Sequence, residues 1–132
     1  MKIDAPISLG ELMDKISILW IKKDKIIEKN KLNLIEDELN LLNKSITIII
    51  NKNKDRRIEI LSLIEDLKKI NAELWGIEDK IRECERNKDF DQNFIELARS
   101  VYITNDKRSE LKNEINLKFG SNIVEVKSYE KY

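Results

Sequence analysis

The sequence contains no histidine, which removes the commonest general base and the commonest zinc ligand of proteins. It has a single cysteine, Cys84, so neither an intramolecular disulfide nor a cysteine metal cluster can form. No glycine-rich phosphate-binding loop is present, and no base is available to activate a serine or the Cys84 thiol. We therefore predict no catalytic residue and no cofactor.

Residues that break helices are also scarce, with three glycines and one proline among 132 residues. The longest apolar runs, "ILWI" at 18–21 and "III" at 48–50, are far shorter than a membrane span. The N-terminal stretch lacks the apolar region of a signal peptide. These features predict one helical domain over residues 1–132, soluble and cytoplasmic, that does not enter a membrane.

The charges are balanced, with 25 lysines and arginines against 25 aspartates and glutamates. A chain of zero net charge lacks the positive field that drives nonspecific binding to nucleic acids, so we predict no nucleic-acid partner. Zero net charge also gives little colloidal protection against self-association. A protein partner or a second copy of the chain is therefore expected.

The capping box "SLGE" at 8–11 predicts the start of a helix, with Ser8 as the cap and Glu11 reaching back. Apolar residues then recur at helical spacing to about residue 28, and a second stripe runs from Leu32 to Ile49. Only a weak break near Asn30 separates the two stripes. One long helix over 9–50 stays open beside two helices, because a seven-residue step continues through Met13, Trp20, Ile27, Leu34, Leu41 and Ile48.

A polar segment, "NKNKDRR" at 51–57, predicts a loop before the clearest heptad in the chain. That heptad has eight positions: Ile60, Leu63, Leu67, Ile70, Leu74, Ile77, Ile81 and Cys84. A turn follows at 85–91 with Asp89 or Asp91 as a cap, and the last helix stops at Gly120. The predicted fold is all-α: an antiparallel bundle of three to four long helices, with coiled-coil-like seams and a short extended C-terminal arm.

Polar side chains interrupt the apolar stripe of the last helix, where Thr104, Asn105 and Arg108 replace hydrophobic residues. If the turn near residue 88 forms a helical hairpin, these residues lie level with Asn71 and its neighbours. Burying Arg108 requires a carboxylate or several carbonyls, because a guanidinium has only donors. The carboxylates that could serve are Glu11, Asp14, Glu78 and Asp79.

Two interpretations of this polar layer stay open. The first, which the sequence favours, is a structural ion pair and amide layer that fixes the register of the helices. The second is a pocket for a small anionic or amide-bearing ligand. Its candidate ligand-binding residues are Asn71, Trp75, Glu78, Arg82, Tyr102, Asn105 and Arg108.

A metal site is the weaker alternative. The pairs Glu11 with Asp14 and Glu78 with Asp79 place carboxylates on helical faces, as metal sites in helical bundles require. They underlie an alternative function, an all-α metal-dependent nucleotide hydrolase. The missing histidine and the missing ExxE-type repeat argue against it.

Four segments carry a resemblance: "SLGELMDKISIL", "NAELWGIEDKIRECE", "FIELARSVYITNDKRSELKNEIN" and "GSNIVEVKSY". Together they resemble an uncharacterised family of short bacterial helical proteins, a domain of unknown function. The resemblance implies no activity, and it implies a context of bacterial surface-polysaccharide biosynthesis. The predicted function is a non-catalytic helical binding or accessory protein in that context. The alternatives are the nucleotide hydrolase and a purely structural helical bundle.

Overall fold

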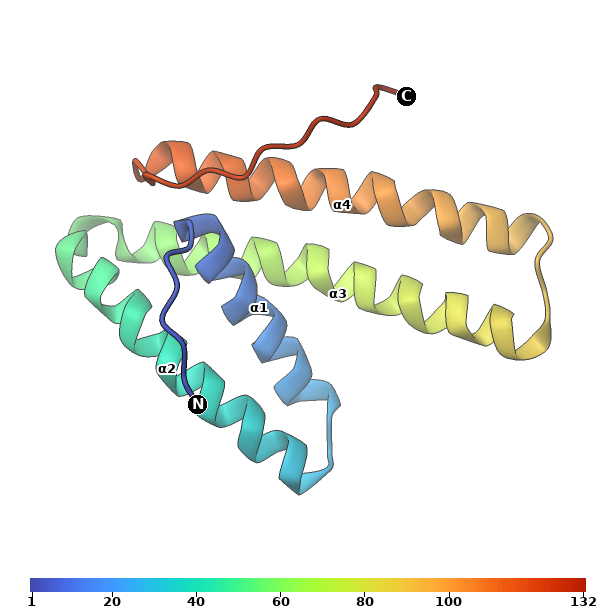
Figure 1. Cartoon of the computed structure of the whole chain (residues 1–132), viewed down its shortest axis with the longest axis horizontal. Coiled ribbons are helices and arrows are strands. Elements are labelled where there is room, and N and C mark those ends of the chain that lie inside the picture. Colours follow the sequence, from blue (N-terminus) through green and yellow to red (C-terminus); the bar gives the residue numbers. More distant parts are fainter.

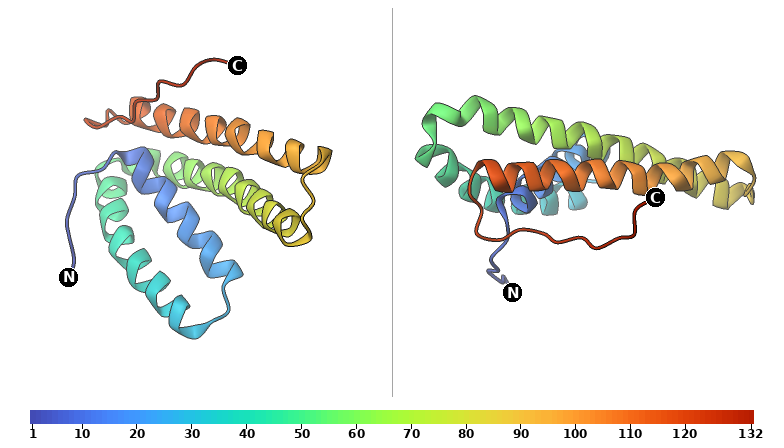
Figure 2. Two further views of the ribbon diagram at one scale, coloured as in Figure 1. Left: turned by 45° about the vertical axis from the view of Figure 1, so that its right-hand side comes forward. Right: turned by 90° about the horizontal axis from the view of Figure 1, so that it is seen from above.

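The computed structural model describes all 132 residues and contains four α-helices and no strand (Figure 1). The helices are α1 (Leu9–Lys25), α2 (Lys29–Lys52), α3 (Arg57–Asn87) and α4 (Gln92–Lys118), and a 3-10 turn, η1 (Lys54–Arg56), joins α2 to α3. α1 crosses α3 and also packs on α4, α2 packs on the other side of α1, and α3 and α4 run side by side (Figures 1 and 2). The predicted all-α bundle is confirmed. None of the helices combines the length and the hydropathy that crossing a bilayer requires.

A three-residue connection separates α1 from α2. Ile26 has an extended backbone (φ −88°, ψ 131°), so the chain reverses and α2 packs back along α1. Residues 9–50 therefore form two helices. The residues that recur every seven positions in the sequence do not share one face, because Met13 is buried whereas Ile27 is exposed. The expectation that the first stripe runs at helical spacing to about residue 28 is corrected, because α1 ends at Lys25.

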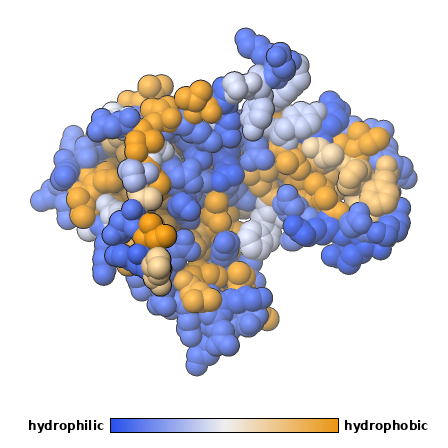
Figure 3. Space-filling model, in the orientation of Figure 1, coloured by the Kyte–Doolittle hydropathy of each residue, from blue (hydrophilic) through white to orange (hydrophobic).

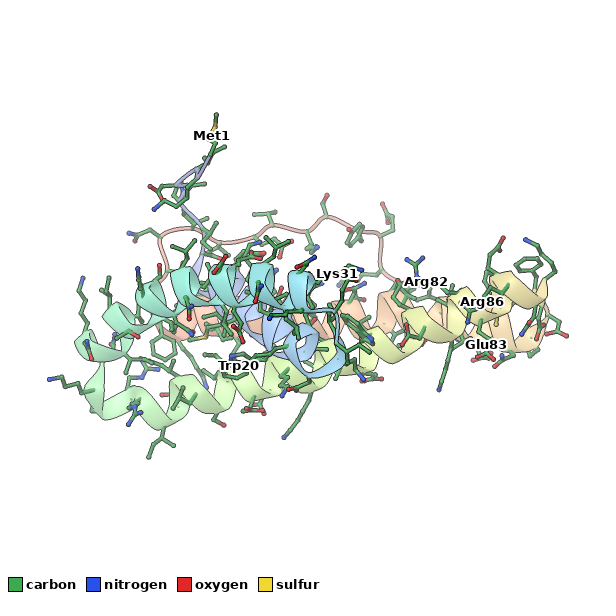
Figure 4. All side chains as sticks on the ribbon, turned by 90° about the horizontal axis from the view of Figure 1, so that it is seen from below. Met1, Trp20, Lys31, Arg82, Glu83 and Arg86 are labelled. Atoms are coloured by element: carbon green, nitrogen blue, oxygen red, sulfur yellow. The ribbon has the colours of Figure 1, made fainter.

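The hydrophobic core lies where α1 crosses α3, with one face of α2 on one side and the C-terminal half of α4 on the other. Its twelve buried residues come from all four helices: Leu12, Met13, Ile16, Leu19, Ile35, Leu39, Ile46, Ile60, Leu63, Ile64, Leu67 and Ile115. The predicted heptad of α3 divides between two partners. Its first half packs in this core, and its second half runs with α4 as a two-helix extension beyond α1 (Figures 1 and 4).

Two turns at the ends of helices position the site. Between α3 and α4, Lys88 adopts a left-handed conformation (φ 53°), and Asp91 occupies the N-cap position without a side-chain capping bond. At the end of α4, Gly120 has φ 63°, and the N–H of Ser121 donates to the carbonyl of Asn116 at 2.8 Å. This Schellman motif turns the chain back beside α4, where residues 121–132 form neither helix nor strand (Figure 1).

Candidate functional site

A fully buried carboxylate, Asp14 of α1, lies where α1, α3 and α4 meet. Its Oδ1 accepts hydrogen bonds from Arg108 Nε and Asn71 Nδ2, each at 2.9 Å, and its Oδ2 accepts from Arg108 Nη2. The Arg108 side chain is 27% exposed, so one edge of the guanidinium reaches solvent. Two parallel hydrogen bonds of this kind fix both partners in orientation. Asp14 is therefore the carboxylate that neutralises Arg108, a choice that the sequence left open among four candidates.

The network continues through Ser17, one turn further along α1. The second N–H of the Asn71 amide donates to Ser17 Oγ at 2.9 Å, and the Ser17 hydroxyl donates to the Asp14 carbonyl at 2.7 Å. Both Asn71 donors are thus used, and its Oδ1 accepts no hydrogen bond within the chain. The hydrogen bond to Asp14 raises the pKa of Arg108 and outweighs the opposing effect of burial. The side chains of three helices are in this way held in one arrangement.

A pocket of about 510 Å³ adjoins this network between α1, α3 and α4. Its volume lies within the range of small-molecule sites. Its apolar lining comes from all three helices: Ile18, Ile21, Leu74, Trp75 and Val101. Its polar lining is Asn71, Glu78, Asp79, Arg82, Asn105 and Arg108. The structure thus brings together six of the seven predicted ligand-binding residues, because they recur at helical spacing on the facing sides of α3 and α4.

The seventh residue, Tyr102, lies elsewhere. It follows Val101 by one position, which turns it by about 100° around α4 and away from α3. Its ring meets that of Tyr132 edge-on, with ring centroids 5.2 Å apart. The two tyrosines line a second cavity of about 790 Å³ between α4 and the C-terminal segment, which shares Val101 and Asn105 with the pocket. The prediction that Tyr102 shares the pocket is corrected accordingly.

The positive charges around the pocket are already matched within the chain. Arg108 is paired with Asp14, and Arg82 lies 3.7 Å from Glu78 on the part of α3 that extends beyond α1 (Figure 4). Asp79 has no ion-pair partner. A simple anion would therefore meet no unmatched positive charge in the pocket. The unpaired groups are the Asp79 carboxylate, the Trp75 indole N–H and one amide group each of Asn71 and Asn105, so the lining suits an uncharged polar ligand better than an anion.

A second buried charge, Lys112, lies one helical turn beyond Arg108 on α4. Its side chain is only 8% exposed, and its Nζ lies 2.7 Å from Glu11 Oε2 and 3.3 Å from Glu125 Oε2. Burial lowers the pKa of Lys112, but the hydrogen bond to Glu11 and the charges around it outweigh burial, so the pKa is raised. We did not predict this cluster. The feature of the sequence that could have predicted this cluster is the position of Lys112, which follows Arg108 by four residues and lies beside the same apolar seam.

The N-terminus of α1 contacts the C-terminal turn of α4 directly. Ser8 Oγ accepts from the Glu11 N–H at 3.1 Å, which confirms the predicted cap, although the Glu11 side chain turns to Lys112 instead of reaching back. The Gly10 N–H donates to Asn116 Oδ1 at 2.7 Å. A Cβ atom on Gly10 would lie 2.5 Å from the carbonyl oxygen of Lys112. Only glycine permits this approach of α1 to α4.

The four carboxylates of the metal alternative do not form a site. Glu11 is paired with Lys112, Asp14 with Arg108, and Glu78 lies on the surface beside Arg82. No three acidic or cysteine side chains are grouped so that they could hold a metal ion. The alternative of a metal site formed by Glu11, Asp14, Glu78 and Asp79 finds no support in this geometry, because Glu11 and Asp14 are paired with Lys112 and Arg108 instead.

Comparisons with protein families, with curated proteins and with solved structures give no match to this chain. The resemblance to a family of short bacterial helical proteins therefore stays a prediction.

Proposed function

We propose that this chain is a non-catalytic binding protein, an accessory protein whose ligand site is the pocket between α1, α3 and α4. The observation that carries the proposal is the combination of a fixed polar network with an adjoining pocket. Asp14, which accepts a hydrogen bond from Asn71, holds the Arg108 guanidinium in place at the pocket wall. A polar layer that served only to fix the register of the helices would need no pocket beside it. It would also have no reason to leave the indole N–H of Trp75 and the Oδ1 of Asn71 unpaired at the wall of that pocket.

The lining specifies the chemistry of the ligand. The indole of Trp75 and the side chains of Ile18 and Val101 offer an apolar surface, which suits a compound with one nonpolar face. Asn71 Oδ1 offers an acceptor and the Asn105 amide a donor, the pair of groups that an amide or two hydroxyls would match. We propose a small, uncharged, amide- or hydroxyl-bearing ligand in preference to the anionic ligand.

The hydrolase alternative finds less support in the geometry. A metal-dependent hydrolase needs several carboxylates around one ion. Glu11 and Asp14, which would supply half of them, are both engaged in ion pairs. The accessory role is therefore the better supported of the two.

The proposed cellular setting is the cytoplasm, beside the enzymes of bacterial surface-polysaccharide synthesis. The free, buried thiol of Cys84 supports a reducing compartment. Sugars that carry an acetamido group would bring both hydroxyls and an amide to the pocket. They are therefore the first compounds to test.

The test is a titration followed by two-dimensional NMR of the ¹⁵N-labelled protein, with three probes: N-acetylglucosamine, glucuronate and inorganic phosphate. We expect N-acetylglucosamine, at concentrations up to about 10 mM, to shift the indole N–H of Trp75 and the side-chain amides of Asn71 and Asn105. Asn105→Ala should weaken these shifts, whereas the matched change Asn122→Ala, on the exposed C-terminal segment, should not. Shifts confined to residues outside the pocket, or no shift with any probe, would refute the proposal. Shifts with phosphate alone would refute the neutral ligand class.

A further inference from the structure

The outer face of α2 is the least covered helical surface of the molecule. Among the α-helices, α2 packs closely on α1 alone, and it lies at the edge of the bundle farthest from α4 (Figures 1 and 2). Only three of its 24 residues are buried. In the space-filling view, where residues 1–8 pass in front of α2, apolar residues interrupt the hydrophilic surface on this side of the molecule (Figure 3).

Three exposed apolar residues form one row along this outer face. Leu34, Leu41 and Ile48 are 70%, 43% and 57% exposed, and each follows the last by seven residues. Residues at this spacing lie on one side of a helix and form the seam by which two helices pair. The row belongs to the seven-residue step of the sequence, whose first member, Met13, is buried in the core. Within the folded chain the row is not packed into the core and stays exposed to solvent.

The charges beside the row are self-complementary. Asp37 lies three residues after Leu34 and Lys44 three residues after Leu41, on the same side of the row. Both are exposed, and neither has an ion-pair partner in the chain. When two such helices pair antiparallel about a two-fold axis at Leu41, Leu34 meets Ile48 of the second copy. Asp37 then lies beside Lys44 of that copy. The two-fold axis generates a second, equivalent pair between Lys44 of the first copy and Asp37 of the second.

We propose that a second copy of this chain is the occupant of this face, bound antiparallel through α2. The balanced net charge leaves no overall repulsion between the copies. A 24-residue helix is about 36 Å long, and one helix pair of that length buries less than the roughly 800 Å² per partner of a standard interface. The dimer is therefore weak and depends on concentration. The pocket between α1, α3 and α4 lies outside this face, so the proposal is independent of the ligand.

The first experiment is sedimentation equilibrium of the full chain between about 10 μM and about 1 mM, the range in which a small interface associates. We expect the mass to rise from the 15.6 kDa of one chain toward twice that value. Leu41→Glu, at the centre of the row, should abolish the rise. The matched control Leu117→Glu, which removes an exposed leucine from α4, should leave it unchanged.

Charge reversal tests the antiparallel arrangement. Asp37→Lys and Lys44→Asp should each stay monomeric alone, because each places like charges together twice across the two-fold axis. An equimolar mixture of the two variants should associate at least as tightly as the parent chain. Circular dichroism should show unchanged folding, since both side chains are exposed. A parent chain that stays monomeric at about 1 mM, or variants whose mixture behaves like its separate components, would overturn the proposal.

Discussion

Replacing Arg108 by methionine should destabilise the fold severely. The Asp14 side chain, only 1% exposed, would lose its ion-pair partner and keep Asn71 as its remaining side-chain donor. Breaking a buried ion pair by removing one partner costs about 3–5 kcal/mol. With an unfolding entropy of about 2.1 cal/mol/K per residue, a chain of 132 residues should lose about 11–18 °C of its melting temperature.

Thermal unfolding followed by circular dichroism at pH 7 measures this loss. Arg82→Met is the matched control: its exposed pair with Glu78 should be worth less than about 1 kcal/mol. The double variant Asp14→Asn with Arg108→Met should recover much of the loss, because it removes the buried charge as well. A drop of less than about 3 °C for Arg108→Met, or a double variant no more stable than the single one, would refute the reasoning.

Two further predictions follow from the contacts of α1 and of the C-terminal segment. Gly10→Ala should cost about 1–3 kcal/mol in urea unfolding, because its new methyl meets the α4 backbone, whereas Gly76→Ala, which has open space, should gain about 0.5–1 kcal/mol. Equal effects of the two changes would contradict the close approach of α1 to α4. The hydrogen bond from Lys127, followed by that from Lys112, lowers the pKa of Glu125 below its ordinary 4.5. The stabilisation from Glu125 is therefore fully present above pH 4.5 and disappears as the pH falls through the lowered pKa of the folded state. Residues 121–132 should become more mobile on acidification in the parent chain, seen as a fall of their ¹H–¹⁵N heteronuclear NOE, and should be mobile already at pH 7 in Glu125→Gln. Equal NOE values in the two chains at pH 7 would contradict this anchoring role.

The parts of the fold that sequence predicted best are those governed by local periodicity. The heptad of α3 keeps its spacing from Ile60 to Cys84, so this spacing alone predicts both the helix and the face that it buries. The meeting of α3 with α4 was also predictable, because the turn near Lys88 sets which residues of a hairpin lie level. For that reason Asn71, Trp75 and Arg108 were expected together, and the structure places them around one pocket.

What the sequence left open depended on how distant segments cross. The break after Lys25 contains neither glycine nor proline, so tertiary packing on α1 decides it. The partner of Arg108 depended on the path of α1 across α3, which no spacing within α1 reveals. The burial of Lys112 required both Glu11 and Glu125, and Glu125 reaches it only because the chain turns back at Gly120. These are contacts between residues far apart in the chain.

The hydrogen bonds that join α1 to the end of the chain have a consequence for the order in which the molecule folds during synthesis. Leu9 and Ser121 are 112 positions apart, and Asp14 and Arg108 are 94 apart. A nascent chain that has emerged only through α3 holds the Asp14 carboxylate but lacks the cation that allows it to be buried. We expect α1 to stay loosely docked until α4 leaves the ribosome, so that folding becomes cooperative only once α4 is available.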